Sequence, residues 1–90
     1  MSIKRFNARR DANEAEIVKA ARAVGIRMWQ LDTPCDWLAC IHGTWWPVEI
    51  KTAKGKLTGP QEQFVADAES AGGMVLIWRS VDDVLASVGQ

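Results

Sequence analysis

The spacing of the apolar residues changes along this 90-residue chain, from the period of an α-helix to that of β-strands and back again. Helical spacing at residues 11–24 is followed by three strand-like runs at 26–31, 36–41 and 45–51. A second helix begins at 58–61 and ends at the glycines 72–73, and a strand at 74–78 precedes a last helix that starts at residue 80. The order α-β-β-β-α-β-α predicts an α/β fold with helices packed on a mixed sheet, because a hairpin is followed by a strand-helix-strand crossover.

Length and composition limit the chain to one small domain. Ninety residues, of which 48% are hydrophobic, support a single core, since a chain of this size buries roughly 60–65% of its unfolded surface. We therefore expect one domain over residues 1–90, with a basic tail at 1–8. The longest apolar runs are too short to cross a membrane, and the charged N-terminus lacks the apolar segment of a secretory signal. A cytoplasmic location is expected, with Cys35 and Cys40 as reduced thiols.

The charges are balanced overall but unevenly distributed. The formal net charge of zero argues against a strong nucleic-acid binder. Residues 1–56 nevertheless hold ten basic residues against six acidic ones, an excess of four positive charges, and the remainder is correspondingly acidic. The candidate contacts to DNA phosphates are Arg9, Arg10, Lys54 and Lys56. An ordinary solvated loop and tail would carry the same residues.

Two polar residues interrupt the apolar stripes of the first two helices. Glu14 lies one helical turn before the stripe of Ile17 and Val18, and Gln61 has the same relation to Phe64 and Val65. Burial of a carboxylate is unfavourable unless it is paired or metal-bound, so Glu14 is expected to have a partner. In the alternative interpretation, Glu14 is an acid of the first helical turn and Gln61 completes a capping box with a threonine.

The strand at 45–51 carries a carboxylate and an ammonium group. The strand period places Glu49 and Lys51 on one face, with Val48 and Ile50 on the other. The hairpin brings Asp36 against Glu49, and a pair of carboxylates suits Mg²⁺ or Mn²⁺, which retain water ligands and bridge to substrate phosphate. This arrangement predicts metal-assisted phosphodiester hydrolysis, in which Lys51 orients water or stabilises negative charge. A surface salt bridge between Glu49 and Lys51 is the alternative.

These residues also resemble a known nuclease motif. Asp36, twelve intervening residues and then Glu49-Ile50-Lys51 resemble the PD-(D/E)XK motif, with Pro34 displaced by one position because Cys35 intervenes. The context adds the acid at position 14 and the segment Leu57-Thr58-Gly59-Pro60-Gln61-Glu62-Gln63-Phe64. Over residues 9–88 the order of these features is similar to that of small virus-type replication-repair nuclease (VRR-NUC) domains, which are encoded by phages and prophages.

The resemblance implies a fold, a site and a partner. It implies an αβββαβ restriction-endonuclease-like core, here with a C-terminal helix, and an enzyme acting in a bacterial host cell. It implies a metal site formed by Glu14, Asp36, Glu49 and the main-chain carbonyl of Ile50, with Lys51 as a catalytic residue and Gln61 in support. Asp32 is a competitor of Asp36 for the acid role. Similarity to Holliday-junction resolvases further implies a homodimer, since a four-way junction presents two symmetric cleavage points.

The expected function is therefore a divalent-metal-dependent, structure-selective DNA endonuclease, with a Holliday-junction resolvase as one form of it. One alternative is a non-catalytic DNA-binding or regulatory protein on the same fold. Another is a protein-interaction module that uses exposed tryptophans. Trp45 and Trp46 are adjacent on a strand, so one of the two is expected to face outward near the hairpin.

Overall fold

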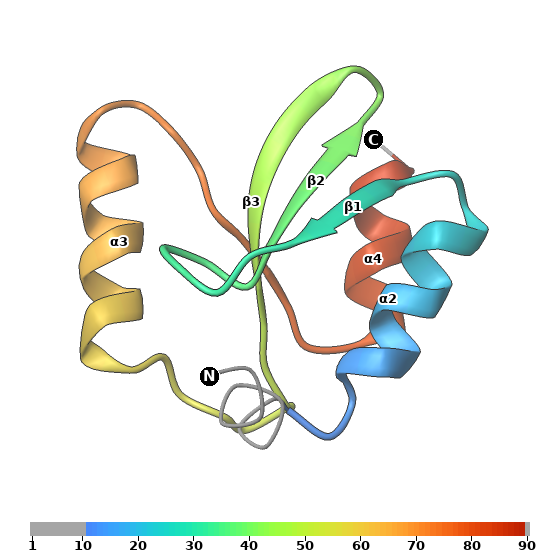
Figure 1. Ribbon diagram of the computed structural model, residues 1–90, viewed down its shortest axis with the longest axis horizontal. Coiled ribbons are helices and arrows are strands. Elements are labelled where there is room, and N and C mark those ends of the chain that lie inside the picture. The colour runs from blue at the N-terminus through green and yellow to red at the C-terminus, as the bar shows by residue number, and fades with distance from the viewer. Residues whose placement is uncertain (1–10, 90) are drawn as a thin grey trace.

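The computed structural model describes residues 11–89 of the chain. Figure 1 shows the arrangement of their helices and strands. The elements follow the predicted order and differ from the predicted bounds by a few residues at their ends. In chain order they are α2 (Glu14–Ala23), β1 (Arg27–Gln30), β2 (Trp37–Ile41), β3 (Thr44–Ile50), α3 (Gly59–Ser70), β4 (Leu76–Trp78) and α4 (Val81–Val88). The predicted basic tail at 1–8 and the two candidate DNA contacts Arg9 and Arg10 lie outside the described residues.

The four strands form one mixed sheet in the order β1-β2-β3-β4. Strands β1, β2 and β3 pair antiparallel, and β3 pairs parallel with β4, as the hairpin and the crossover through α3 require. The hairpin loop is one residue shorter than the predicted 42–44, because Thr44 pairs with Ile41. The two loop residues, His42 and Gly43, have φ values of 53° and 82°. Positive φ at both positions is typical of the turns that match the twist of two-residue hairpins.

The hydrophobic core lies between one face of the sheet and the helices α2 and α4. Figure 1 shows these two helices next to each other, and both contact the sheet. Ile17 and Ala21 of α2 and Val84 of α4 are buried in one cluster with Val48 of β3 and Trp78 of β4. The predicted stripe of α2 therefore faces the core, except for its last member, Val24, which follows the helix and is exposed. The helix begins at Glu14 with Asn13 as its N-cap, three residues after the predicted start, and a backbone turn precedes it.

Helix α3 differs from the prediction in its burial. It begins as expected, because the Thr58 side chain accepts a hydrogen bond from Gln61 N, and Gln61 accepts one from Thr58 N, which completes a capping box. The apolar stripe of Phe64, Val65 and Ala68 is only half-buried, and none of the helix residues is fully buried. Figure 1 shows the reason: α3 stands apart from the pair α2 and α4, on the other side of the strands.

The outward face of the sheet carries aromatic side chains. Trp45 is 58% exposed, whereas its neighbour Trp46 packs against the core, so the predicted alternation is confirmed. Trp29 of the edge strand β1, two strands away, is also exposed, and its ring lies 5.3 Å from that of Trp45. Within residues 11–89, no helix is long and apolar enough to span a membrane.

Candidate functional site

Asp36 lies directly before β2, and its side chain reaches across to the end of β3. In the register of the hairpin, Trp37 is opposite Val48, which places the preceding residue, Asp36, beside the next residue of β3, Glu49. The Asp36 carboxylate accepts a hydrogen bond of 2.9 Å from the backbone N–H of Ile50. The two parts of the motif are thus held together by a bond between a side chain and the backbone.

Glu49 is completely buried near the end of β3. Its carboxylate oxygen Oε1 accepts a hydrogen bond of 3.2 Å from the Gln61 side-chain amide. The same Gln61 side chain accepts from Thr58 N at 2.8 Å, so it caps α3 and contacts Glu49 at once. The capping-box interpretation of Gln61 is therefore confirmed, whereas its role in support of a metal site stays a prediction. Glu49 and Ile50 were predicted to lie on opposite faces of β3. Both residues are buried, because this end of β3 is covered on both faces.

Glu14 occupies a different environment. It is buried at the first position of α2, and its carboxylate accepts a hydrogen bond from the indole N–H of Trp37. Among residues 11–89, no three His, Cys, Asp or Glu side chains are close enough together to hold a metal ion. The expectation that Glu14 has a partner is met by Trp37, and its role as a metal ligand stays a prediction.

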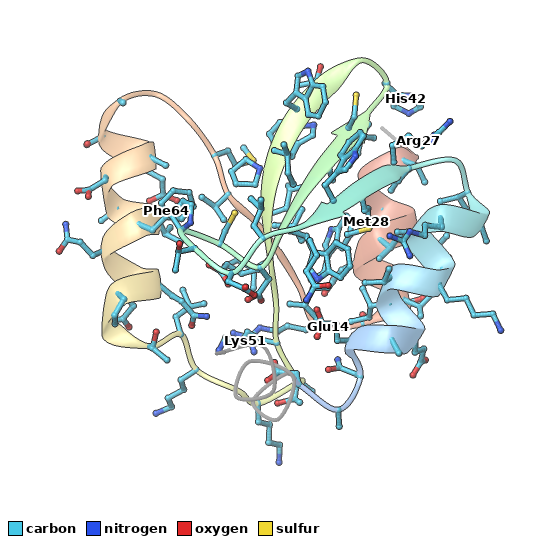
Figure 2. The ribbon with its side chains drawn as sticks, in the orientation of Figure 1. Glu14, Arg27, Met28, His42, Lys51 and Phe64 are labelled. Atoms are coloured by element: carbon cyan, nitrogen blue, oxygen red, sulfur yellow. The ribbon has the colours of Figure 1, made fainter. Side chains whose placement is uncertain are left out.

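Lys51 follows β3 directly and is half-buried. Its backbone N–H donates to the Trp78 carbonyl at 3.0 Å, which extends the pairing of β3 with β4 by one residue. Its own carbonyl accepts a hydrogen bond of 3.1 Å from the Asn13 side-chain amide. Figure 2 shows Lys51 and Glu14 at the same end of the sheet. The backbone at Lys51 is therefore held from both β4 and the start of α2.

The loop that follows Lys51 is held by Arg79. This half-buried guanidinium donates to the backbone carbonyls of Thr52 at 2.7 Å and Gly55 at 2.6 Å. The loop is tight, since a Cβ at Gly55 would lie 2.8 Å from Thr52 Oγ1. Lys54 and Lys56, the predicted phosphate contacts, are exposed on this loop. Arg79 thus determines how two exposed cations are presented beside the candidate site.

Sequence reasoning did not identify Arg79, Asn13 or Trp37 as residues of this region. Asn13 joins two segments, because its amide donates to the carbonyls of Lys51 and Arg79, each at 3.1 Å. The sequence did contain one signal for Arg79. It is the only basic residue after position 56, and it directly follows a predicted buried strand in the sequence. A cation in such a place requires hydrogen-bond acceptors. Trp37 offered no signal, since a tryptophan in an apolar strand is ordinary.

Cys35 lies beside the two carboxylates. Its thiol is buried and donates to the Trp37 carbonyl at 3.4 Å. Burial raises the pKa of the Cys35 thiol, and the negative charges of Glu49 and Asp36 raise it further. Both cysteines are free thiols, as predicted.

The donor atoms at this position suit a hard divalent cation. Asp36, Glu49 and the Ile50 carbonyl offer only oxygen, the ligand type that Mg²⁺ and Mn²⁺ prefer. Mg²⁺ is commonly held by one or two carboxylates, with water and substrate phosphate as its other ligands. Two neighbouring carboxylates, with no third one grouped with them in the described part of the chain, therefore fit such an ion.

Comparisons of the chain with models of protein families, with curated proteins and with solved structures found no match. The resemblance to VRR-NUC domains consequently rests on the residues and their arrangement alone.

Proposed function

We propose that this protein is a divalent-metal-dependent DNA endonuclease of the PD-(D/E)XK class, with a restriction-endonuclease-like core similar to that of VRR-NUC domains. The observation that supports the proposal most directly is the hydrogen bond from Ile50 N to the Asp36 carboxylate, directly beside the buried Glu49. Residues 13 positions apart that match the two parts of the motif are brought to one place, and Gln61 reaches the same place from α3.

The roles of the residues follow from their chemistry. Asp36 and Glu49 would hold Mg²⁺ or Mn²⁺ together with the Ile50 carbonyl, and the ion supplies Lewis-acid stabilisation of the charge that develops on the phosphate. Lys51 orients the attacking water or stabilises negative charge on the phosphate oxygens. Gln61 holds the Glu49 carboxylate in position through its amide. Lys54 and Lys56 contact DNA phosphates, which carry no sequence information, so the enzyme selects DNA by structure.

The proposed assembly is a homodimer in which the second copy covers the outward face of the sheet. Trp45, Pro47 and Met74 line an open groove that continues onto Ala68 of α3, so this groove is largely apolar. Isolated helices as short as α3 are marginally stable in water and depend on packing of an apolar face. A second copy on this face would bury the groove together with the half-buried stripe of α3, and a two-fold dimer also matches a symmetric four-way junction.

The proposal is tested by cleavage of labelled four-way junction, flap and linear duplex DNA in Mg²⁺, Mn²⁺ or EDTA. The variant is Glu49→Gln, which preserves the shape of the buried side chain and an acceptor for the Gln61 amide while it removes the charge. The matched control is Glu69→Gln, the same chemical change at an exposed position of α3. Circular dichroism and thermal melting establish that both variants are folded.

Metal-dependent cleavage that is lost in Glu49→Gln and retained in Glu69→Gln supports the proposal. DNA binding without cleavage in either metal would contradict it and favour a non-catalytic DNA-binding protein. Absence of both binding and cleavage would favour a protein-interaction module that uses the exposed tryptophans.

A further inference from the structure

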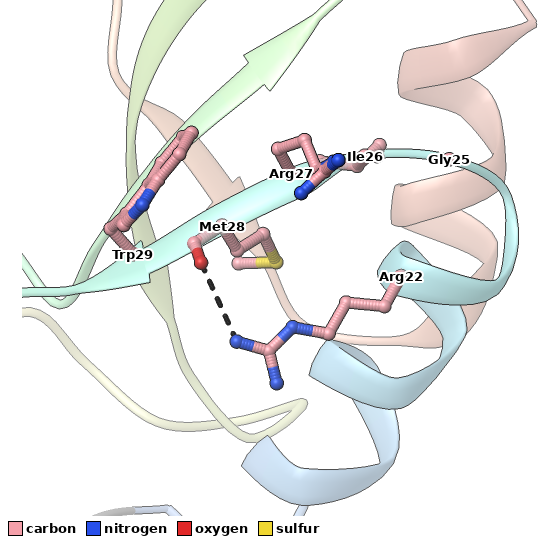
Figure 3. Close-up of a pocket in the computed structure, with 6 residues that line it drawn as sticks. All are labelled: Arg22, Gly25, Ile26, Arg27, Met28 and Trp29. Carbon is pink, nitrogen blue, oxygen red and sulfur yellow. Dashed lines mark hydrogen bonds between the residues drawn. The ribbon is translucent and has the colours of Figure 1, made fainter.

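Two adjoining hollows follow the junction between helix α2 and the edge strand β1, and Arg22 lines both. Figure 3 shows the first hollow, where Arg22 and Arg27 lie near the exposed Trp29. The second hollow runs along α2, where Lys19 and Arg22 face Gln30, and it ends at Glu14 and Trp37. We call the two hollows together the α2–β1 groove.

The cationic side chains of the α2–β1 groove are open to solvent. Lys19, Arg22 and Arg27 are all exposed. Lys19 and Arg22 are three residues apart on α2 and are therefore neighbours on its surface. Arg27 follows on β1 after the turn at Gly25. Among the described residues that line the groove, Glu14 is the only acid, so this lining is positively charged along most of its length.

The floor of the groove positions Arg22. The Trp37 ring is buried, and the Arg22 guanidinium lies 5.5 Å from its centroid, a distance at which a cation and an aromatic face attract each other. The same guanidinium donates to the Met28 carbonyl at 3.4 Å, the hydrogen bond drawn in Figure 3. These contacts hold the charge of Arg22 along the groove. A guanidinium presents five donors in a planar fork, so others remain for a ligand.

Two residues that line the groove lie close to the candidate site. The inner end of the groove is formed by Glu14 and Trp37, and Asp36 directly precedes Trp37 in the chain. We propose that the α2–β1 groove binds the phosphate backbone of the DNA substrate through Lys19, Arg22 and Arg27 and directs it toward Asp36. This inference rests on the proposed function and extends the DNA contacts beyond the loop of Lys54 and Lys56. Charge complementarity favours a polyphosphate, since cations along a groove contact successive phosphates.

The test measures how the dissociation constant for a fluorescent DNA substrate depends on salt, in EDTA so that no metal-dependent cleavage occurs. Lys19→Gln and Arg27→Gln each remove one cation from the groove. Arg22 stays unchanged, because its contacts to Trp37 and Met28 would confound the result. The control Ala66→Glu changes the net charge by the same amount at an exposed position of α3.

Each groove variant is expected to bind more weakly and to reduce the slope of log K against log salt by about one, whereas the control keeps the wild-type slope. If the wild-type protein binds DNA tightly and both groove variants keep the wild-type slope, the proposed role of the groove in DNA binding is overturned. The nuclease proposal would then remain intact. Binding of an acidic peptide in preference to DNA would overturn the assignment of the ligand. Failure of the wild-type protein to bind any of the DNA substrates would overturn both proposals together.

Discussion

The Asp36 carboxylate is hydrogen-bonded to the backbone N–H of Ile50 at 2.9 Å, across the hairpin that pairs β2 with β3. This bond gives Asp36 a structural role in addition to the chemical role proposed for it. The two roles can be separated, because the structural one requires an acceptor and the chemical one requires a charge.

Replacement of Asp36 by asparagine is expected to abolish cleavage with a small effect on folding. The asparagine oxygen can still accept from Ile50 N, whereas Asp36→Ala removes the acceptor and should lower the free energy of unfolding by about 1–3 kcal/mol. Urea unfolding of both variants measures the structural part, and cleavage by Asp36→Asn measures the chemical part. Wild-type cleavage by Asp36→Asn would show that the charge has no role.

The two contacts of Gln61 can be separated in the same way. Thr58→Ala removes the cap of α3 and should lower the free energy of unfolding by about 1 kcal/mol, with little effect on cleavage. Gln61→Ala removes both the cap and the donor to Glu49, so it should lower stability and cleavage together. Unfolding curves and cleavage rates measured for the two variants provide the comparison. An equal loss of cleavage in both variants would reduce Gln61 to a capping residue.

Substitution of Arg79 is expected to loosen the loop that carries Lys54 and Lys56. Arg79→Gln loses the bridge between the Thr52 and Gly55 carbonyls, so hydrogen exchange at Gly55, whose N–H donates to Thr52 O, should become faster. Exchange is measured by mass spectrometry on peptides that cover residues 51–57. Arg27→Gln, which also removes a cation, is the control and should leave exchange in this loop unchanged. Unchanged exchange in Arg79→Gln would mean that the loop is held by other contacts.

The proposed dimer interface is tested by a charge at its centre. Light scattering should give the wild-type protein twice the chain mass of 10.0 kDa, and Trp45→Glu should give a single chain. Burial of an unpaired carboxylate between two copies is unfavourable by several kcal/mol, whereas the same group is well solvated on a monomer. The control Leu85→Glu introduces a carboxylate at another exposed apolar residue, on α4, and should remain dimeric. A monomeric wild-type protein, or dissociation of both variants, would contradict this interface.

Much of the fold could be predicted because the relevant signals are local. Apolar spacing within a few residues distinguishes helix from strand, Thr58 and Ser80 accept the capping bonds of α3 and α4, and the loop at His42 and Gly43 closes the hairpin. A further local signal, a glutamate that continues an apolar stripe, correctly indicated that Glu14 is buried with a partner. These predictions hold because each depends on neighbours along the chain.

The partners of these residues were decided by the tertiary structure. Glu14 meets Trp37 across 23 positions, and the Asn13 amide meets the Arg79 carbonyl across 66. The half-burial of α3 is of the same kind, since its apolar spacing is that of a packed helix although α3 stands apart from the core. A local pattern determines which face of an element is apolar. What that face meets depends on how distant segments pack, because hydrogen bonds and burial are determined by distances in space, and spacing along the chain does not encode those distances.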